Sequence, residues 1–317
     1  MLISVIVPTH NRAEHLANCL RALARQQFPA ADAEVIIIAD GCTDRTAAVA
    51  AAAIADRPNW RLIETERRGA AGARNTGILA AQGTLIAFTD DDCLPREDWL
   101  ARIASGFVAR PEVLALGGRT VTEQEKVTPL SHWVEDDLPY SFPSCNLAVR
   151  RRALWLVGGF DPRFFPNEDW DLTFALQEIG QMAYDPELVV LHPPRPERLT
   201  KLVKAVNALD TEFLLAAKHP VAYRRSVHRS PWRVIYYHQF FVQAALKLWR
   251  FRKLPLSKPR QFVSLMILLA GQRLYLVCLF PHFLRCRRRA AAERRGDSPG
   301  RRQRPLRDLR QNSPCGS

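Results

Sequence analysis

Short runs of apolar and β-branched residues alternate with helical segments at the start of this 317-residue chain, and no other feature restricts the possible folds as strongly. Residues 2–7 (LISVIV) are too few for a helix and stop at Pro8, so they predict a buried strand. Similar runs at residues 35–39, 60–64 and 84–88 predict three more strands. Strands that alternate with helices build βαβ units, so we expect an α/β fold whose mainly parallel sheet is flanked by helices.

The helices between these strands begin at residues that often cap helices. Asn11 precedes the first helix, and Thr43 or Asp44 precedes an alanine-rich helix. A third helix is expected at residues 70–81. These caps place each helix directly after a strand.

Polar residues follow three of the predicted strands directly. They are Pro8-Thr9-His10, Asp40-Gly41 and Asp90-Asp91-Asp92. Parallel strands end at one edge of the sheet, and ligands of α/β proteins bind at that edge. We therefore expect the three segments to lie together.

The acidic run at residues 90–92 has two interpretations. Three adjacent carboxylates repel one another unless a cation compensates their charge, and hard oxygen ligands suit Mg²⁺ or Mn²⁺. Such an ion could also neutralise a departing diphosphate. A solvated acidic turn that caps the next helix explains the residue types equally well. The position at a strand end favours the metal site.

Two further segments also allow two interpretations each. Residues 67–77 (RRGAAGARNTG) place glycines and arginines at a predicted helix start, which suits phosphate, although the spacing matches no established phosphate loop. Asp40 can accept hydrogen bonds from a base or ribose, or can be a turn residue before Gly41.

Acidic residues and a histidine recur in the second half of the chain. Glu168, Asp169 and Asp171 stand at a predicted helix start, where they favour the helix dipole or supply a general base. His192 follows a short predicted strand and is either a metal ligand or a surface residue. Residue types alone favour the helix-dipole and surface interpretations.

Six ordered segments together resemble the family-2 glycosyltransferases of the GT-A fold. They are SVIVPTHNR at residues 4–12, ADGCTDRT at 39–46, GARNTGI at 72–78, FTDDD at 88–92, GGFD at 158–161 and EDWDL at 168–172. The resemblance covers roughly residues 1–195. Six segments in order are far more specific than any one of them.

The resemblance implies an inverting enzyme that moves a sugar from a nucleoside-diphosphate-sugar, with a UDP-sugar favoured, to a hydroxyl acceptor. It also implies a divalent metal cofactor, Mg²⁺ or Mn²⁺. The implied donor-binding residues are Pro8, Thr9, His10, Asp40, Arg74, Asn75 and Asp91. The implied metal ligands are Asp90, Asp92 and His192, and the implied catalytic residues are the base Asp169 and its neighbour Glu168.

The chain departs from the family pattern at a few positions. Ala39 and Cys42 stand where many members have aspartate and serine, and Asp91 makes the middle of the DxD motif acidic as well. No clear equivalent of the motif of processive members is present, which favours transfer of a single sugar. A nucleotidyltransferase and a non-catalytic sugar-nucleotide-binding protein are the alternatives. The first predicts a glycine-rich loop directly after the first strand, which residues 8–11 do not form.

The basic character of the chain is concentrated at its C-terminal end. Residues 250–317 hold 17 Lys and Arg against 3 Asp and Glu. This excess alone accounts for the net charge of +13 of the whole chain. We expect a GT-A-like domain at residues 1–200, a helical extension at 201–285 and a basic, disordered tail at 286–317. The apolar stretches 231–249 and 262–284 predict helices that lie in a membrane interface or, alternatively, a helical subdomain packed on the core. The expected anchors are Trp232, Trp249, Tyr275 and Phe280.

These features predict where the protein acts. The seven cysteines show no CxxC spacing and the N-terminus shows no signal peptide, which favours the cytoplasm and a peripheral position on the inner face of the cell membrane. A glycan or lipid-linked acceptor fits that position. Nucleic-acid binding is not expected, because the arginine run lacks a recognisable motif.

Overall fold

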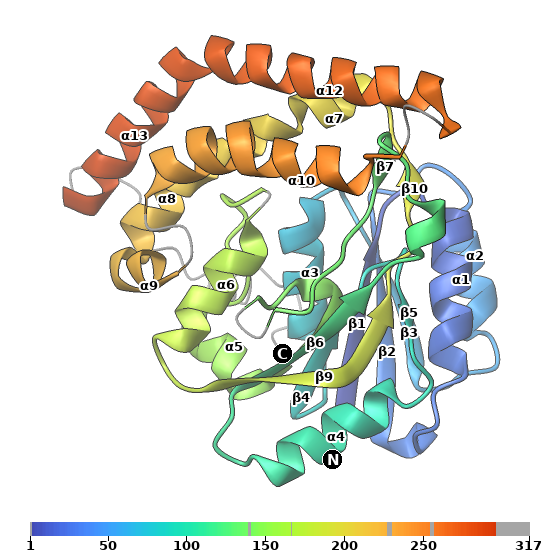
Figure 1. The fold of residues 1–317 in the computed structure, drawn as a ribbon. Coiled ribbons are helices and arrows are strands. Elements are labelled where there is room, and N and C mark those ends of the chain that lie inside the picture. The colour runs from blue at the N-terminus through green and yellow to red at the C-terminus, as the bar shows by residue number, and fades with distance from the viewer. Residues whose placement is uncertain (1, 139–140, 166, 227–229, 254–256, 296–317) are drawn as a thin grey trace.

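The computed structural model describes residues 2–138, 141–165, 167–226, 230–253 and 257–295. An eight-stranded sheet stands at the centre, with helices on both faces and a helical layer above one edge (Figure 1). The strands are β1 (Ile3–Thr9), β2 (Ala33–Asp40), β3 (Trp60–Thr65), β4 (Leu85–Phe88), β5 (Leu94–Pro95), β6 (Ala115–Val121), β8 (Leu147–Arg150) and β9 (Met182–Leu191). The helices of this part are α1 (Ala13–Ala24), α2 (Thr46–Ile54), α3 (Gly69–Ala80), α4 (Trp99–Ala109), α5 (Arg151–Val157) and α6 (Glu168–Gln177).

The order of the strands is β3-β2-β1-β4-β8-β6-β9-β5. The first four are parallel, β8 runs antiparallel to β4 and β6, and β9 is again parallel to β6. A separate two-stranded sheet joins β7 (Ser131–His132) to β10 (Arg195–Pro196). The predicted α/β fold with a mainly parallel sheet is therefore confirmed.

Side chains alternate between the two faces of the sheet and build two cores. Ile3, Val5 and Val7 of β1 face a core that includes residues of α1, α2 and α4. Ile6 faces the opposite core, which includes residues of α3, α5 and α6. Because both faces of β1 and β2 are covered, these strands are almost wholly apolar, which made them easy to predict.

Two local predictions need correction. Asn11 does not cap the helix that follows it: its backbone has a positive φ of 52°, and its Oδ1 accepts hydrogen bonds from the Thr43 and Asp44 amides. Its side chain thus holds the loop before α2. Residues 286–295 are helical rather than disordered, because Ala290 is buried in the same apolar cluster as Phe283. The rest of the predicted tail, 296–317, lies outside the described residues.

The helical layer begins at Leu199 and lies above the carboxyl ends of the parallel strands (Figure 1). Its elements are α7 (Leu199–Lys204), η4 (Ala205–Asp210), α8 (Thr211–Lys218), α9 (Pro220–Arg225), the π-helix η5 (Arg233–Val242), α10 (Gln243–Arg250), α12 (Pro259–Cys278) and α13 (Phe280–Arg295). An apolar cluster that includes Phe213, Ile235 and Leu276 joins η4, α8, η5, α12 and α13. Trp232 and Tyr275, two of the expected membrane anchors, are partly buried against this cluster.

Among the described helices, α12 is the one that is long and apolar enough to cross a membrane. It lies along α7, where Gln272 Nε2 donates a 2.9 Å hydrogen bond to the Leu202 carbonyl. Arg273, near the middle of the helix, donates to the Leu269 carbonyl one turn earlier. Gln272 and Arg273, near the middle of α12, therefore bond to the protein itself.

Candidate active site

The polar segments that follow β1, β2 and β4 meet at one edge of the sheet, as expected. Thr9 Oγ1 donates a 2.7 Å hydrogen bond to Asp91 Oδ2, because β1 and β4 are neighbours in the sheet. His10 Nδ1 lies 2.7 Å from the Asp40 carbonyl oxygen and so joins the ends of β1 and β2. Pro8 lies in β1 beside Ile38.

Asp92 is the most heavily compensated carboxylate at this edge. Its Oδ2 accepts hydrogen bonds from Arg12, at 3.0 Å, and from Arg195 of β10, and its Oδ1 lies 3.4 Å from His192 Nε2. Burial alone would raise the pKa of Asp92, but His192, Arg195 and Arg12 hold it below its ordinary value. Asp92 is therefore ionised at neutral pH although it is buried.

Asp91 has the opposite electrostatic balance. Burial raises its pKa to about 6, even though Arg12 Nη1 lies 2.9 Å from its Oδ1 and opposes the shift. The neighbouring Asp92 and Asp90 carboxylates add to the increase. Asp91 and Asp92 therefore differ in how readily they hold a proton.

Arg74 connects the acidic run to the start of α6. The buried guanidinium donates to Asp90 Oδ1 at 2.7 Å and to Glu168 Oε1 at 3.2 Å, and it stacks over the ring of Phe160. The pKa of Arg74 is raised, since Asp90, Asp169 and Glu168 outweigh the effect of burial. The Gly- and Arg-rich segment thus contributes a cation between two acidic groups.

Glu168 and Asp169 begin α6 beside a cavity of about 250 Å³. Burial and the neighbouring Asp169 raise the pKa of Glu168 to about 7. Burial also raises the pKa of Asp169, against the opposing effect of Arg74. Asp169 Oδ2 accepts a 3.0 Å hydrogen bond from the Ser144 amide, while its Oδ1 is buried and has no hydrogen-bond partner in the described part of the chain.

Asp40 and Asn75 are buried and bonded to the backbone. Asp40 accepts hydrogen bonds from the Arg68 and Gly69 amides at 2.6 and 2.9 Å, so it holds the start of α3. The Asn75 amide bonds to both the carbonyl and the N–H of Phe160, at 2.7 and 2.9 Å. These contacts position the segments around the site. The residue types alone did not predict this positioning role.

One group of side chains at this edge has the spacing of metal ligands. Ligand atoms of Asp92, Cys93 and His192 lie within 4.8 Å of one another, and His192 Nδ1 is buried without a hydrogen-bond partner among the described residues. Asp92 and His192 are ligand types that divalent ions accept, so these residues fit the expected metal. Asp90 lies instead against Arg74, and its assignment as a ligand stays a prediction.

Sequence reasoning missed several members of this site. Arg12 lies within the first matched segment, whereas Arg195 follows a Pro-Pro pair that carries no motif. His132 of β7 lies beside His192, with ring centroids 5.8 Å apart. Burial, Arg195 and His192 lower the pKa of His132 to about 4, so its imidazole is neutral at pH 7.

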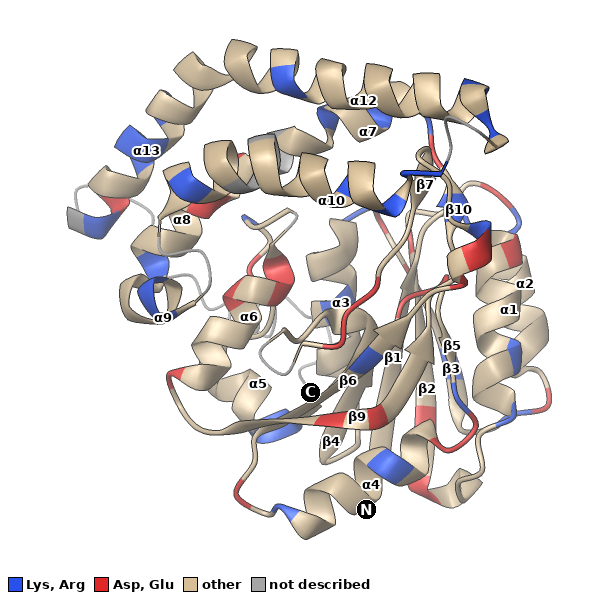
Figure 2. Cartoon of the chain, viewed as in Figure 1, with Lys and Arg blue, Asp and Glu red and all other residues tan. Residues whose placement is uncertain are grey.

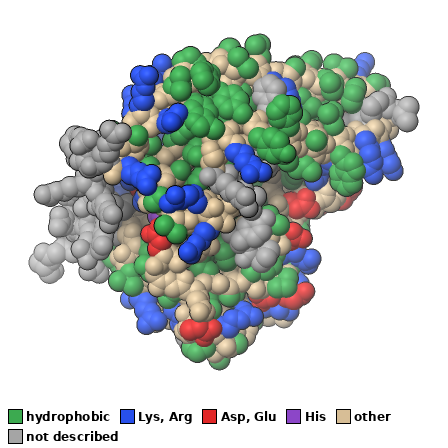
Figure 3. Space-filling model, turned by 60° about the vertical axis from the view of Figure 1, so that its left-hand side comes forward, with side chains coloured by type: hydrophobic (Ala, Val, Ile, Leu, Met, Phe, Trp, Pro, Cys, Tyr) green, Lys and Arg blue, Asp and Glu red, His purple; other side chains and the backbone are tan. Residues whose placement is uncertain are grey.

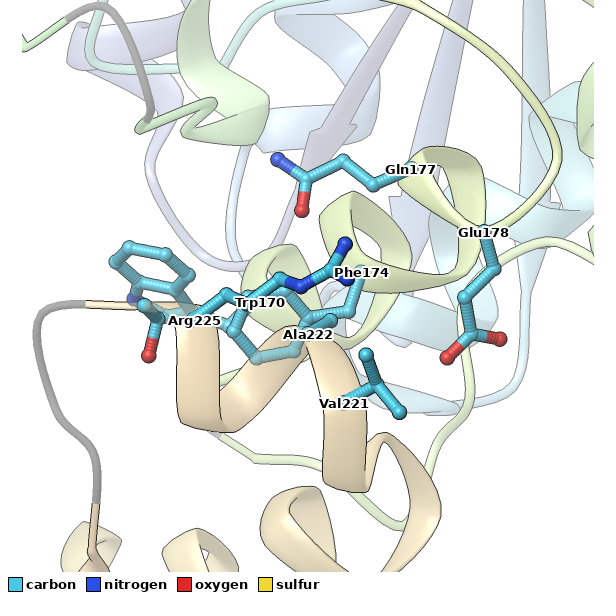
Figure 4. A pocket seen from close by; sticks show the side chains of 8 residues that line it. Trp170, Phe174, Gln177, Glu178, Val221, Ala222 and Arg225 are labelled. Carbon is cyan, nitrogen blue, oxygen red and sulfur yellow. The ribbon is translucent and has the colours of Figure 1, made fainter.

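A second, larger cavity of about 550 Å³ lies between α6 and α9 (Figure 4). Trp170, Phe174 and Gln177 of α6 line one side, and Val221 and Arg225 of α9 line the other. Trp170 also lines the cavity beside Asp169. The same helix therefore borders both cavities.

Solved structures with the same fold bind nucleotide-sugars. A mannosyltransferase from Pyrobaculum calidifontis, solved with GDP-Man and Mn²⁺, is 23% identical to the chain and superposes with a TM-score of 0.60 over 87% of this chain and 86% of its own. S. aureus TarS in complex with UDP-GlcNAc is 15% identical and has a TM-score of 0.55, over 87% and 91% of the two chains. At these identities the similarity shows the fold alone, which is that of GT-A glycosyltransferases.

Sequence comparison defines the family. The model of glycosyl transferase family 2 matches residues 4–160. The glycosyltransferase AglE of Haloferax volcanii is 30% identical over 61% of this chain and 67% of its own length. The pre-mycofactocin glycosyltransferase of Mycobacterium tuberculosis is 27% identical over 69% of this chain but only 48% of its own. The chain belongs to glycosyltransferase family 2 and is a glycosyltransferase, as the ordered segments predicted.

Proposed function

We propose that the protein is a metal-dependent, inverting glycosyltransferase that transfers one sugar from a nucleoside-diphosphate-sugar to a hydroxyl group. A UDP-sugar is the favoured donor, and a glycan or a lipid-linked glycan of the cell envelope is the proposed acceptor. The observation that carries the proposal is Asp169, a carboxylate with one buried, unpartnered oxygen beside a cavity. A base needs such a free oxygen to accept a proton from an acceptor hydroxyl.

The donor would lie over the acidic run. We assign the nucleoside to Pro8, Thr9, His10 and Asp40, and the rest of the donor to Asp91, Arg74 and Asn75. Asp92 and His192, together with Asp90, would hold Mg²⁺ or Mn²⁺, which stabilises the charge of a leaving diphosphate when bound. The arginines at this edge support the proposal, because guanidinium groups bind phosphate oxygens well.

The acceptor would enter from the side of α6. The cavity beside Asp169 is lined by Ser141, Phe142 and Pro143 as well as by α6, so both walls are formed by segments outside the nucleotide-binding part. In one in-line step, Asp169 would take the proton of the acceptor hydroxyl while that oxygen attacks the sugar carbon, and the bond from this carbon to the nucleoside diphosphate would break on the opposite side. The neighbouring Glu168 would hold Arg74 in place.

A contact with the membrane is the second part of the proposal. The exposed side of α12 carries Val263, Met266, Ile267, Leu274 and Val277, which recur with the period of one helix face. Arginines follow on α13, and Figure 2 shows basic residues on this layer, with few acidic ones. Figure 3 shows the apolar side chains gathered over the upper part of the molecule. We infer a peripheral position on the cytoplasmic face of the membrane, with α12 lying in its plane.

The alternatives have less support. A nucleotidyltransferase would bind phosphate through a loop directly after β1, but here the residues after β1 bond to the ends of β2 and β4. A non-catalytic binding protein would not require a free carboxylate oxygen beside a cavity. Nucleic acid is not proposed as a partner.

Asp169→Asn tests the base assignment. A panel of nucleotide-sugars with Mn²⁺ is first screened by thermal shift, since a bound donor stabilises the fold. Release of nucleoside diphosphate from the best donor is then measured. We expect the variant to keep the thermal shift and to lose turnover by about 10²- to 10⁴-fold.

Asp56→Asn is the matched control, because Asp56 is an exposed aspartate in the turn that follows α2. It should behave as the unchanged protein does. Full turnover of Asp169→Asn would exclude Asp169 as the base. Full turnover of the unchanged protein under a chelator would exclude the metal.

A further inference from the structure

A cluster of three different ligand types lies in the helical layer, away from the candidate active site. Asp210 ends η4, and His282 and Cys286 lie four residues apart on α13, hence on one face of that helix. Their ligand atoms all lie within 4.8 Å of one another, and all three residues are partly buried. The proposed function uses none of them.

The hydrogen bonding of this cluster is incomplete without a further group. Asp210 Oδ2 lies 3.3 Å from His282 Nε2, and Cys286 Sγ lies 3.4 Å from the same nitrogen. A single ring nitrogen either donates a proton to the carboxylate or accepts one from the thiol, so it cannot satisfy both. If His282 instead relayed a proton between Cys286 and Asp210, these two side chains would bond to opposite nitrogens of its ring. Because the carboxylate and the thiol approach the same nitrogen, the three ligand atoms converge on one point.

The spacing fits a tetrahedral metal ion. Zinc lies about 2.0–2.1 Å from nitrogen and oxygen ligands and about 2.3 Å from sulfur, which puts tetrahedral neighbours roughly 3.4 Å (N to O) and 3.6 Å (N to S) apart. The observed separations are 3.3 and 3.4 Å. Asp210 is also the N-cap residue of α8, yet its side chain makes no capping hydrogen bond.

We propose that Asp210, His282 and Cys286 bind Zn²⁺ and that the ion fastens α13 to η4. A thiolate, an imidazole and a carboxylate form a softer set than the oxygen ligands that Mg²⁺ or Mn²⁺ prefer, so this site favours Zn²⁺ over those two ions. Water would complete the tetrahedron.

The test uses the full chain, stripped with a chelator and then titrated with Zn²⁺ or Co²⁺ in excess Mg²⁺. We expect a zinc site that Mg²⁺ does not displace, and a thiolate-to-cobalt charge-transfer band. Cys286→Ser should abolish the band, and Asp210→Asn should weaken zinc binding by more than about tenfold. Zinc should also slow amide exchange in α13.

Cys278→Ser is the matched control, because Cys278 is a free, exposed cysteine of the neighbouring helix α12. It should keep both the zinc affinity and the cobalt band. An unchanged band in Cys286→Ser would overturn the proposal, because the ion would then lie elsewhere, for example at Asp92, Cys93 and His192. Wild-type zinc affinity in a folded Asp210→Asn protein, or no zinc binding by the unchanged chain, would overturn it as well.

Discussion

The sheet region (residues 3–196) and the helical region (residues 199–295) differ in how their charged and hydrophobic side chains are placed. In the sheet region, buried charges are paired at close range, and apolar strands are covered on both faces. Most of the large hydrophobic side chains that the structure describes as exposed lie in the helical region, among them Trp249, Leu274 and Val277. The sheet region depends on internal electrostatics, whereas the helical region presents a surface that water solvates poorly.

The largest effect that separates the two regions should come from removing a buried cation. Arg74→Met leaves Asp90 and Glu168 without their shared partner, so we expect the free energy of unfolding to fall by about 3–5 kcal/mol. Urea denaturation measures this. The control is Lys201→Met in the helical region, because Lys201 is exposed and its ion pair with Glu197 should contribute about 0–1 kcal/mol. If both variants lost the same free energy of unfolding, the two regions would not differ in their dependence on ion pairs.

The buried acids of the sheet region should also make stability depend on pH. Glu168 has a pKa of about 7 in the folded protein against an ordinary 4.5, so the folded state binds more protons between these values. Its contribution to stability is present below pH 4.5 and is lost as the pH rises to about 7, by up to about 3 kcal/mol.

Urea midpoints measured across this pH range should show the slope flattened in Glu168→Gln. The exposed Glu187 supplies the control variant, Glu187→Gln, which should keep the slope of the unchanged protein. Parallel curves for all three proteins would show that Glu168 titrates normally.

The smallest effect concerns the surface of the helical region. Ile267→Glu or Leu274→Glu should each reduce binding to vesicles of phosphatidylglycerol and phosphatidylcholine by about tenfold or more, because each removes an apolar side chain from the proposed contact. Vesicle sedimentation measures binding. Val108→Glu changes an equally exposed side chain on α4 and should bind as the unchanged protein does. If all three proteins bind alike, α12 is not the membrane contact.

The sequence predicted the sheet region well because its strands are short, apolar and followed directly by polar residues. The meeting of Thr9 with Asp91 follows from the order of strands alone. Strand β6 was missed, because Gly117 and Gly118 interrupt its apolar pattern. Gly118 is required where β6 passes Leu188, since a Cβ there would lie 2.0 Å from the Leu188 carbonyl oxygen.

The parts of the site that could not be predicted depend on contacts between distant segments. Arg195 reaches Asp92 only because β10 pairs with β7, and neither two-residue strand has a pattern of its own. Ser144 binds Asp169 through its backbone amide, which leaves no trace in residue type. The burial that raises the pKa of Glu168 likewise depends on the whole arrangement.

The arginines that compensate the acidic run reach it at very different times during synthesis. Arg12 and Arg74 precede the run in the chain, but Arg195 is made about a hundred residues after Asp92. Strand β4 also has to wait for β8, which begins at Leu147, before its second edge is closed. Before Arg195 has been made, water must therefore solvate the Asp92 carboxylate in its place. Pairing between segments so far apart in the chain is slow. The edge of the sheet that carries the acidic run is therefore completed only after more than half of the chain has left the ribosome.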